Sequence, residues 1–200
     1  MNKTISVRDL SKSFGEKRVI SSLTLDLPLG AVTALMGPSG CGKTTLAFLL
    51  AGLIPPDAGE ISGVPEKKAF VFQEDRLAEE FSALSNVRFV LPGRDRKRAA
   101  ELLARLGLGE ELSRPVREFS GGMKRRVALA RALAYDADIL FLDEPFKGLD
   151  EKSREEAVRC TLEMTAGKTV IFITHDPEEA EALGGGVIDL GTLLPREQER

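Results

Sequence analysis

Glycine, lysine and threonine recur in one short segment with a spacing that suits the binding of phosphate. Residues 37–44 read Gly-Pro-Ser-Gly-Cys-Gly-Lys-Thr and fit the pattern G-x-x-x-x-G-K-[ST]. The glycines let backbone N–H groups turn inward, and a helix starting here would add its positive end. Lys43 would contact nucleotide phosphates and Thr44 would bind Mg²⁺. The segment predicts a nucleotide-binding loop, with a glycine-rich surface turn as the alternative.

Two carboxylates close the strongly apolar segment 139–142 further along the chain, and Pro145 ends it. The carboxyl end of a buried strand is where α/β sheets bind ligands. Asp143 would hold magnesium, directly or through water, and Glu144 would be the base that polarises an attacking water. The alternative is a pair of solvated acids at the end of a strand.

Gln73 and His175 close two further apolar segments, 69–72 and 170–173. If these strands are parallel, both side chains lie at the sheet edge that carries the carboxylates. A glutamine amide can coordinate Mg²⁺ or orient water, and His175 can contact a γ-phosphate. Alone, a single histidine is more often an ordinary hydrogen-bonding residue.

Ser120 precedes Gly121 and Gly122 at the start of an expected helix that runs to about residue 135. A serine cap followed by two glycines makes a second helix start able to bind an anion. The alternative is an ordinary N-cap.

Alternating strands and helices must position these groups. Segments 3–10 and 19–27 alternate apolar and polar residues, as half-exposed antiparallel strands do. Segment 31–36 runs into the phosphate loop, and a helix follows over 43–52. Segments 69–72, 139–142 and 170–173 are continuously apolar, which is typical of an interior parallel sheet. The pattern predicts an α/β fold.

Strand signals are absent from about residue 74 to 118, where 94–106 reads as a charged amphipathic helix closed by Gly107. We expect one domain over 1–200. Its α/β core, with an antiparallel β subdomain, comprises 1–73 and 119–200, and a helical lobe is inserted over about 74–118.

The composition limits the setting. The chain has 200 residues, 42% of them hydrophobic, and a net charge of −3, which argues against broad nucleic-acid binding. The apolar, Gly and Pro run 46–56 is too short and broken to span a bilayer, and residues 1–9 have no signal-peptide core. The two cysteines favour a reducing cytoplasm. We expect any connection with a membrane to come through a partner.

Read in order, these motifs resemble the nucleotide-binding subunit of ATP-binding cassette (ABC) transporters over nearly the whole chain. Met123, in place of the usual glutamine, and the segment 73–77 resemble the nitrate, sulfonate and taurine importers within that family. The resemblance implies a P-loop NTPase core that hydrolyses ATP with Mg²⁺ and powers import through a separate permease.

The resemblance also implies a head-to-tail dimer in which each ATP lies between one subunit's phosphate loop and the Ser-Gly-Gly turn of the other. Phe14 matches the aromatic residue that stacks on adenine. The catalytic residues would be Gln73, Glu144 and His175, and Thr44, Gln73 and Asp143 would bind the metal. The expected nucleotide contacts are Phe14, Gly37, Pro38, Ser39, Gly40, Cys41, Gly42, Lys43, Thr44, Thr45, Ser120, Gly121, Gly122 and Asp150, the last lining the dimer seam.

The expected partners are a permease, which would hold this chain on the inner face of the membrane, a second copy of the chain, and an extracytoplasmic solute-binding protein. We expect no nucleic acid. Because the chain ends soon after Leu190, we also expect no appended regulatory domain. The usual Ser-Ala-Leu-Asp is here Lys-Gly-Leu-Asp over 147–150, which keeps the aspartate.

Three smaller points stay open. Leu77, Phe81 and Leu84 either receive the permease or form the core of the lobe. The basic clusters 94–98 and 124–126 are expected to be solvated helix faces. Cys41 is expected to fill the loop as a small residue, with alkylation inhibiting and ATP protecting.

The alternatives are of different classes. A non-transport ABC ATPase acting on nucleic acid or on a protein complex usually carries a long coiled coil or a second cassette. A small-molecule kinase would leave the Ser-Gly-Gly turn unexplained. A degenerate, purely binding cassette is disfavoured by the intact Glu144 and His175.

Overall fold

A five-stranded parallel sheet forms the centre of the protein in the computed structural model, which describes residues 4–194. Its strand order is β5-β6-β7-β3-β8. The strands are β3 (Val32–Met36), β5 (Lys68–Val71), β6 (Ile139–Asp143), β7 (Thr169–Ile173) and β8 (Gly186–Asp189). Every residue of β6 and β7 is buried, which explains their continuously apolar sequences.

A second, antiparallel sheet covers one face of the molecule, in the order β2-β1-β4. It consists of β1 (Thr4–Phe14), β2 (Lys17–Pro28) and β4 (Ala58–Ser62). The antiparallel pairing expected from the alternation in 3–10 and 19–27 is confirmed, although Lys3 lies outside the described residues. β4 was not predicted from the sequence.

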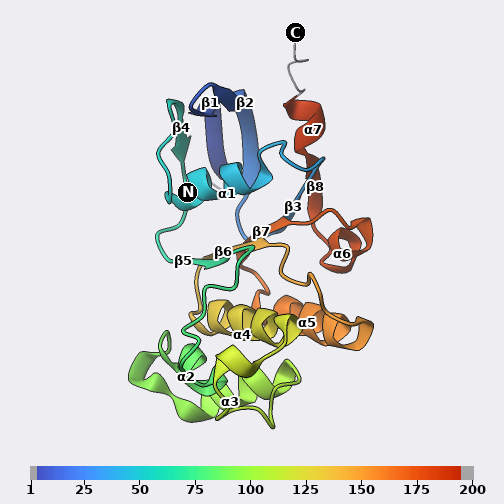
Figure 1. The fold of residues 1–200 in the computed structure, drawn as a ribbon. Helices are drawn as coiled ribbons and strands as arrows, with labels where there is room; N and C mark the ends of the chain where they lie inside the picture. The colour runs from blue at the N-terminus through green and yellow to red at the C-terminus, as the bar shows by residue number, and fades with distance from the viewer. Residues whose placement is uncertain (1–3, 195–200) are drawn as a thin grey trace.

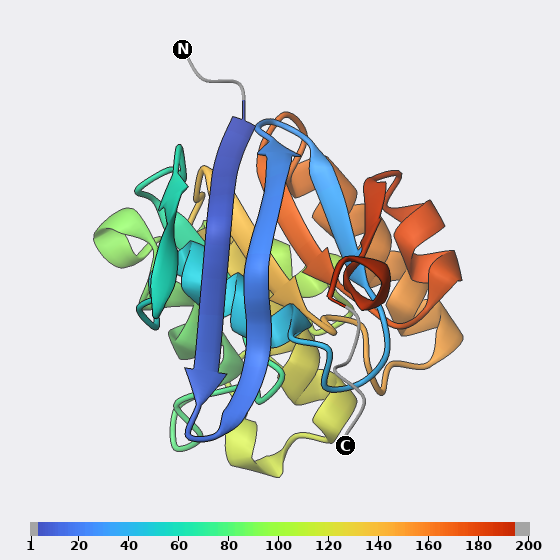
Figure 2. The same cartoon turned by 90° about the horizontal axis from the view of Figure 1, so that it is seen from above.

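Helix α1 (Lys43–Ala51) lies between the two sheets (Figures 1 and 2). Its buried leucines, Leu46, Leu49 and Leu50, share one core with Ile5 of β1 and Phe141 of β6. The helix ends at Gly52, as the sequence predicts. The phosphate loop, at the start of α1, is therefore fixed from both sides.

The opposite face of the parallel sheet is covered by α4 (Gly121–Ala134) and α5 (Glu151–Met164), as Figure 1 shows. Two shorter helices complete the C-terminal part, α6 (Pro177–Ala182) and α7 (Leu190–Leu193). Helix α4 begins directly after Ser120, as expected, whereas α5 was not predicted.

Segment 74–118 contains two α-helices, α2 (Ala83–Arg88) and α3 (Arg96–Arg105), and the short 3₁₀ helices η1 (Pro92–Arg94) and η2 (Val116–Glu118). No named strand lies within it. Buried side chains of both α-helices, such as Val87 and Leu103, belong to the same core as Leu133 of α4. This segment therefore packs on α4 at the end of the molecule farthest from the antiparallel sheet (Figure 1).

The expected fold class is confirmed: an α/β protein with a parallel sheet, an antiparallel β subdomain and helices on both faces. Because β3, β5, β6 and β7 run parallel, the segments that follow them all emerge at one edge of the sheet. These segments are the phosphate loop, Gln73, Asp143 with Glu144, and His175.

Candidate functional site

The phosphate loop joins β3 to α1, and its backbone leaves donors for an anion. Every other α-helix within residues 4–194 begins with a Ser or Asp side chain that accepts a hydrogen bond from its first turn. Helix α1 instead begins at Gly42, with a φ of 103° and no side-chain cap. The N–H groups of its first turn thus lack a side-chain acceptor, and a phosphate oxygen would satisfy them.

Lys43 folds back over this loop. Its Nζ donates to the carbonyl oxygens of Gly37, at 2.7 Å, and Pro38, at 3.1 Å. Both acceptors are neutral carbonyls, so neither hydrogen bond is an ion pair that an arriving phosphate would have to break. Thr45, the next residue but one, is half-buried in the first turn of α1.

Cys41 is buried beneath the loop and belongs to the core between the two sheets. The expectation that it fills the loop as a small residue is confirmed. Cys41 is only 6% exposed, which disfavours reaction with a reagent, and its alkylation stays a prediction.

Thr44 and Asp143 meet although they are far apart in the sequence. The Thr44 hydroxyl donates to Oδ2 of Asp143 at 2.7 Å. Burial raises the pKa of Asp143, and the Thr44 hydrogen bond only partly opposes this. A buried carboxylate beside a hydroxyl is an oxygen set of the kind that hard divalent cations accept. The two residues therefore fit a Mg²⁺ ion.

Glu144 follows in a left-handed backbone conformation, with a φ of 47°, which is uncommon for a side chain of this kind. Its carboxylate accepts a hydrogen bond from Nζ of Lys147 at 2.6 Å and lies 3.4 Å from Nδ1 of His175. Burial raises the pKa of Glu144, but Lys147 and His175 outweigh it and the net pKa is lowered. Glu144 is thus held as a carboxylate.

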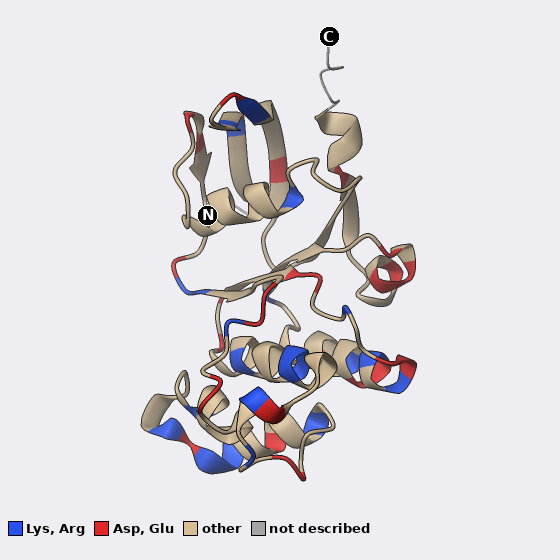
Figure 3. Cartoon of the chain, viewed as in Figure 1, with Lys and Arg blue, Asp and Glu red and all other residues tan. Residues whose placement is uncertain are grey.

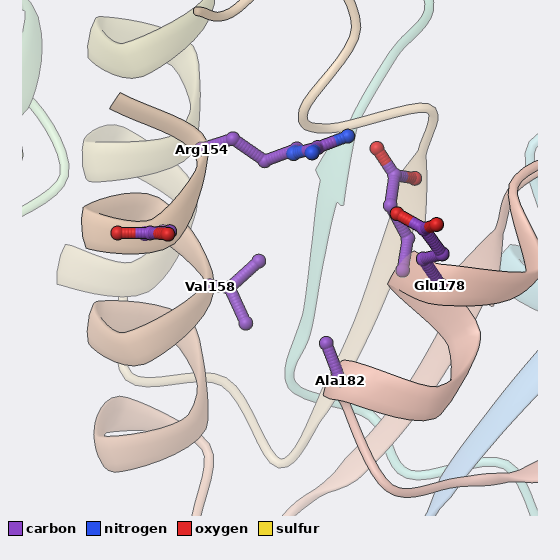
Figure 4. A pocket seen from close by; sticks show the side chains of 6 residues that line it. Arg154, Val158, Glu178 and Ala182 are labelled. Carbon is purple, nitrogen blue, oxygen red and sulfur yellow. The ribbon is translucent and has the colours of Figure 1, made fainter. Parts of the chain in front are cut away.

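His175 is 71% exposed and turned toward Glu144. A cavity lined by residues of α5 and α6, among them Arg154 and Glu179, lies beside the segment that carries His175 (Figure 4). Thr174 donates to Glu179 on α6 at 2.6 Å, while Arg154 on α5 lies 3.6 Å from Asp176. The residues on either side of His175 are therefore held by contacts with α5 and α6, while its ring is exposed to solvent.

A separate cleft lies beside α4 and contains the second group of expected residues. It is lined by Gln73, the Ser-Gly-Gly turn 120–122 and Asp150, but by no residue of the phosphate loop. The Ser-Gly-Gly turn of one chain thus opens into a cleft that its own phosphate loop does not line. The Gln73 side chain makes no hydrogen bond with any described residue, and its contact with Mg²⁺ stays a prediction.

Both expected dimer-seam groups also cap helices. The Ser120 hydroxyl oxygen accepts a hydrogen bond from the N–H of Met123 at 3.3 Å. Asp150 accepts from the N–H of Ser153 at 3.0 Å, and this bond lowers the pKa of Asp150. The N-cap interpretation offered for Ser120 is confirmed, and Asp150 caps α5 in the same way. The Ser120 hydroxyl oxygen acts as acceptor in this cap, so its proton stays available to a ligand.

Phe14 lies at the end of β1 and is 51% exposed. The adjacent strand β2 lies close to the loop, because a Cβ atom added at Gly42 would lie 3.2 Å from Cγ1 of Val19, a residue of β2. The centroid of the Phe14 ring lies 5.8 Å from Nζ of Lys12 on the same strand, and its stacking on adenine stays a prediction.

The three apolar candidates of the lobe separate into two groups. Leu84 is buried and Leu77 packs against the core, so these two are core residues. Phe81 is 52% exposed and makes an edge-to-face contact with the exposed Phe89, with ring centroids 5.2 Å apart. The aromatic pair of Phe81 and Phe89 is therefore an apolar surface feature.

The basic clusters differ from each other. Cations over 94–98 lie at the end of the lobe, where Figure 3 shows blue and red segments side by side, and Lys97 is 3.8 Å from Glu101. The expectation of a solvated face is wrong for the other cluster, because Arg125 is only 4% exposed. This burial has no local signal in the sequence, since Arg125 stands between two other cations.

No helix within residues 4–194 is long and apolar enough to cross a bilayer.

Comparison with known proteins gives a consistent result. A family model described as ABC transporter matches residues 20–147. The aliphatic sulfonates import ATP-binding protein SsuB 2 of Paracoccus denitrificans is 42% identical over 92% of this chain and 76% of its own length. The sulfate/thiosulfate import ATP-binding protein CysA of Yersinia pestis is 39% identical over 92% of this chain, which spans only 57% of that relative.

Solved structures agree. The dimeric post-hydrolysis structure of the ATP-binding cassette MJ0796, bound to ADP and Pi, has a TM-score of 0.82 and 29% identity, and the match covers 92% of this chain and 93% of that one. A nucleotide-binding loop, an acidic strand end and a separate Ser-Gly-Gly cleft are thus combined in a fold shared with ATP-binding cassettes. The chain belongs to the ABC transporter family and is one of its ATP-hydrolysing subunits.

Proposed function

We propose that this chain drives import through a separate permease by hydrolysing ATP at a site completed by a second copy of itself. The observation that carries the proposal is the convergence of Thr44, Asp143, Glu144 and His175, from separate segments, at one edge of the parallel sheet. The separate cleft of Ser120 supports the requirement for a second copy.

Each group at the sheet edge has a distinct role. The first turn of α1 and Lys43 would bind the β and γ phosphates. Thr44, Asp143 and Gln73 would hold Mg²⁺, which neutralises phosphate charge when bound. The Glu144 carboxylate would take the proton of the attacking water, and its lowered pKa keeps it ionised for this task. His175 would contact the γ-phosphate, and Phe14 would stack on adenine.

The second copy would contribute Ser120, Gly121 and Gly122 to the same ATP, with Asp150 at the seam. Two bound nucleotides would close the dimer through contacts that exist only across the interface. Loss of the γ-phosphate would remove those contacts and open it.

The import direction rests on the relatives, whose names describe sulfonate and sulfate import. The permease would hold the chain at the cytoplasmic face of the membrane, and an extracytoplasmic solute-binding protein would deliver the solute. Segment 74–118 is proposed as the lobe that faces the permease, with the aromatic pair of Phe81 and Phe89 at its contact surface. The solute would be selected by these partners.

The test of the catalytic assignment is Glu144→Gln. We expect hydrolysis by the purified chain with ATP and Mg²⁺ to fall by roughly 10²–10⁴-fold, because a positioned base contributes on that scale. ATP binding should be retained, and an ATP-bound dimer should accumulate on size-exclusion chromatography.

Glu101→Gln, on the lobe surface, is the matched control and should hydrolyse ATP at the normal rate. If Glu144→Gln turns over ATP as fast as this control, Glu144 is not the base.

A further inference from the structure

A single buried cation, Arg125, connects the start of α4 to the ends of two strands of the parallel sheet. Its side chain is only 4% exposed, and burial of a guanidinium is costly unless its donors are all used. Arg125 has no role among the proposed phosphate, Mg²⁺ and general-base groups. Its position therefore needs a separate explanation.

The guanidinium of Arg125 donates to backbone carbonyls at both strand ends. Nη1 donates to Phe72, just past β5, and Nη2 donates to Asp143, the last residue of β6. The carbonyl of Glu144 accepts from Nε at 3.1 Å and from Nη2 at 2.6 Å. The carboxylate of Asp75 lies 3.2 Å from Nη1 and supplies a counter-charge.

These contacts fix the backbone of Glu144 on its carbonyl side. On its other side, the N–H of Glu144 donates to the carbonyl of Ile173 on β7 at 2.9 Å. With a φ of 47°, Glu144 is in a conformation that a side chain of its kind keeps only when its surroundings impose it. Arg125 and β7 together impose it, and so determine where the carboxylate points.

The same guanidinium also touches the segment after β5. The carbonyl of Gln73 lies 3.4 Å from Nη1, in addition to the Phe72 and Asp75 contacts. Arg125 therefore joins the backbone that precedes Gln73 to the backbone that carries Glu144. The flat fork of a guanidinium can serve several carbonyls at once, which a lysine ammonium cannot do in the same geometry.

We propose that Arg125 is a positioning residue that sets the orientation of Glu144 for hydrolysis and links it to the Ser-Gly-Gly turn at the start of the same helix. This rests on the proposed function, in which Glu144 is the base. Ser120 begins the helix that carries Arg125. In a dimer, Ser120 contacts the ATP held by the partner while Glu144 acts on its own, so Arg125 joins the two sites of the pair.

The test compares Arg125→Met and Arg125→Lys with Arg131→Met in the purified chain. Arg131 lies on the same helix and donates to the carbonyls of Asp75 and Arg76, but makes no contact with Glu144. It is thus a matched control for loss of an arginine that braces the same segment. ATP affinity is measured with a fluorescent ATP analogue, kcat by phosphate release and folding by circular dichroism.

We expect Arg125→Met to lower kcat by about 10²-fold, the effect of displacing a catalytic group, while ATP affinity changes by less than about 3-fold. Arg125→Lys, which keeps the charge and loses the fork, should fold and recover part of the rate. Arg131→Met should retain kcat within about 3-fold. A normal kcat for Arg125→Met, or an equal loss for Arg131→Met, overturns the proposal.

A double-mutant cycle separates an effect through Glu144 from general damage. In a Glu144→Gln background, single-turnover hydrolysis should fall by less than about 3-fold when Arg125 is also replaced, because the group it orients is already gone. If Arg125→Met costs the same factor in both backgrounds, Arg125 does not act through Glu144 and the proposal is wrong. Arg125→Lys gives the same cycle if the methionine variant does not fold.

These outcomes are distinct from failure of the proposed function. Normal hydrolysis by Glu144→Gln itself would remove Glu144 as the base and with it the role of Arg125. If Glu144→Gln slows hydrolysis as expected, but Arg125→Met lowers the rate by the same factor with and without Glu144→Gln, only the role of Arg125 is contradicted.

Discussion

At the scale of single residues, the charge around Glu144 is set by two neighbours that approach from different segments. Lys147 is three positions further along the chain and forms a salt bridge with the carboxylate, and His175 comes from the end of β7. Burial opposes both by raising the pKa of Glu144, yet the net pKa is lowered. Lys147 is thus the neighbour whose removal changes the ionisation of the base most directly.

Lys147→Ser tests this balance. A general base is active only when ionised, so the acid limb of the kcat profile follows the pKa of Glu144. Removal of Lys147 leaves burial less opposed and raises this pKa. The acid limb, measured in saturating Mg²⁺ and ATP, should therefore move to higher pH.

The control is Lys152→Ser, at an exposed position at the start of α5, which should leave the profile in place. An acid limb that does not move in Lys147→Ser, or that moves to lower pH, would contradict this assignment of charge.

Residue-level prediction from sequence succeeds where a group belongs to a local motif. Lys43 and Thr44 belong to a local motif whose residue spacing predicts the backbone conformation of the loop. The Thr44 hydroxyl oxygen does lie 2.7 Å from Oδ2 of Asp143. Arg125 was not predicted to be buried, because its carbonyl partners, Phe72 just past β5 and Asp143 of β6, are far away in the sequence. The orientation of such a side chain depends on tertiary packing and has no local signal.

At the scale of elements, the antiparallel sheet depends on a close approach in β4. Gly59 has a φ of 82°, and a Cβ added there would lie 2.4 Å from the carbonyl oxygen of Asp9. The pairing between β1 and β4 changes register at this point, between Arg8 and Ser11. Only glycine fits both the backbone conformation and the space.

Gly59→Ala should therefore destabilise the fold by more than about 1 kcal/mol, since alanine meets both strain and a backbone clash. The denaturant midpoint and Tm report this loss. Gly186→Ala is the control, because Gly186 also lies in a strand but has no atom near its added Cβ, and its effect should stay within about 0.5 kcal/mol. Equal stability of the two variants would show that the close approach at Gly59 is not limiting.

Elements with strong periodicity were predicted from the sequence, and those with weak periodicity were not. The apolar strands β6 and β7 lie within one residue of their predicted bounds, 139–142 and 170–173. Helix α5 was not predicted because its buried residues, Ser153, Ala157, Cys160 and Thr161, are small or polar and leave little apolar pattern. Strand β4 was missed because it is mostly exposed and contains a glycine.

At the scale of the whole molecule, the lobe presents an apolar surface with no core function. Phe81 and Phe89 are 52% and 47% exposed, while Leu84 of the same segment is buried. An exposed aromatic pair on a subunit that works through a membrane partner is a candidate contact for that partner.

Phe81→Asp should thus reduce co-purification with the proposed permease partner, while the isolated chain keeps its Tm and basal ATPase rate. Leu84→Asp is the contrasting variant and should unfold the lobe, because Leu84 is only 4% exposed. Loss of folding in Phe81→Asp would show that Phe81 is a core residue. Undiminished assembly with the permease would show that Phe81 does not contribute to that contact.

We propose that the phosphate loop and the Ser-Gly-Gly turn of one chain are two half-sites that serve different ATP molecules. The phosphate loop lies between the two sheets, whereas the Ser-Gly-Gly turn opens into a cleft lined by Gln73 and Asp150. Each nucleotide would therefore be enclosed by two copies in a head-to-tail arrangement.

Site-directed cross-linking between copies tests this claim most directly. Two variants are prepared in a shared background that carries Glu144→Gln and lacks the native thiols through Cys41→Ala and Cys160→Ala. One variant adds Ser39→Cys, and the other adds Ser120→Cys. With ATP and a short bismaleimide, the mixture should yield a covalent dimer containing one copy of each, while either chain alone should not. ATP-dependent dimers that cross-link only between identical chains, or not at all, would contradict the head-to-tail site.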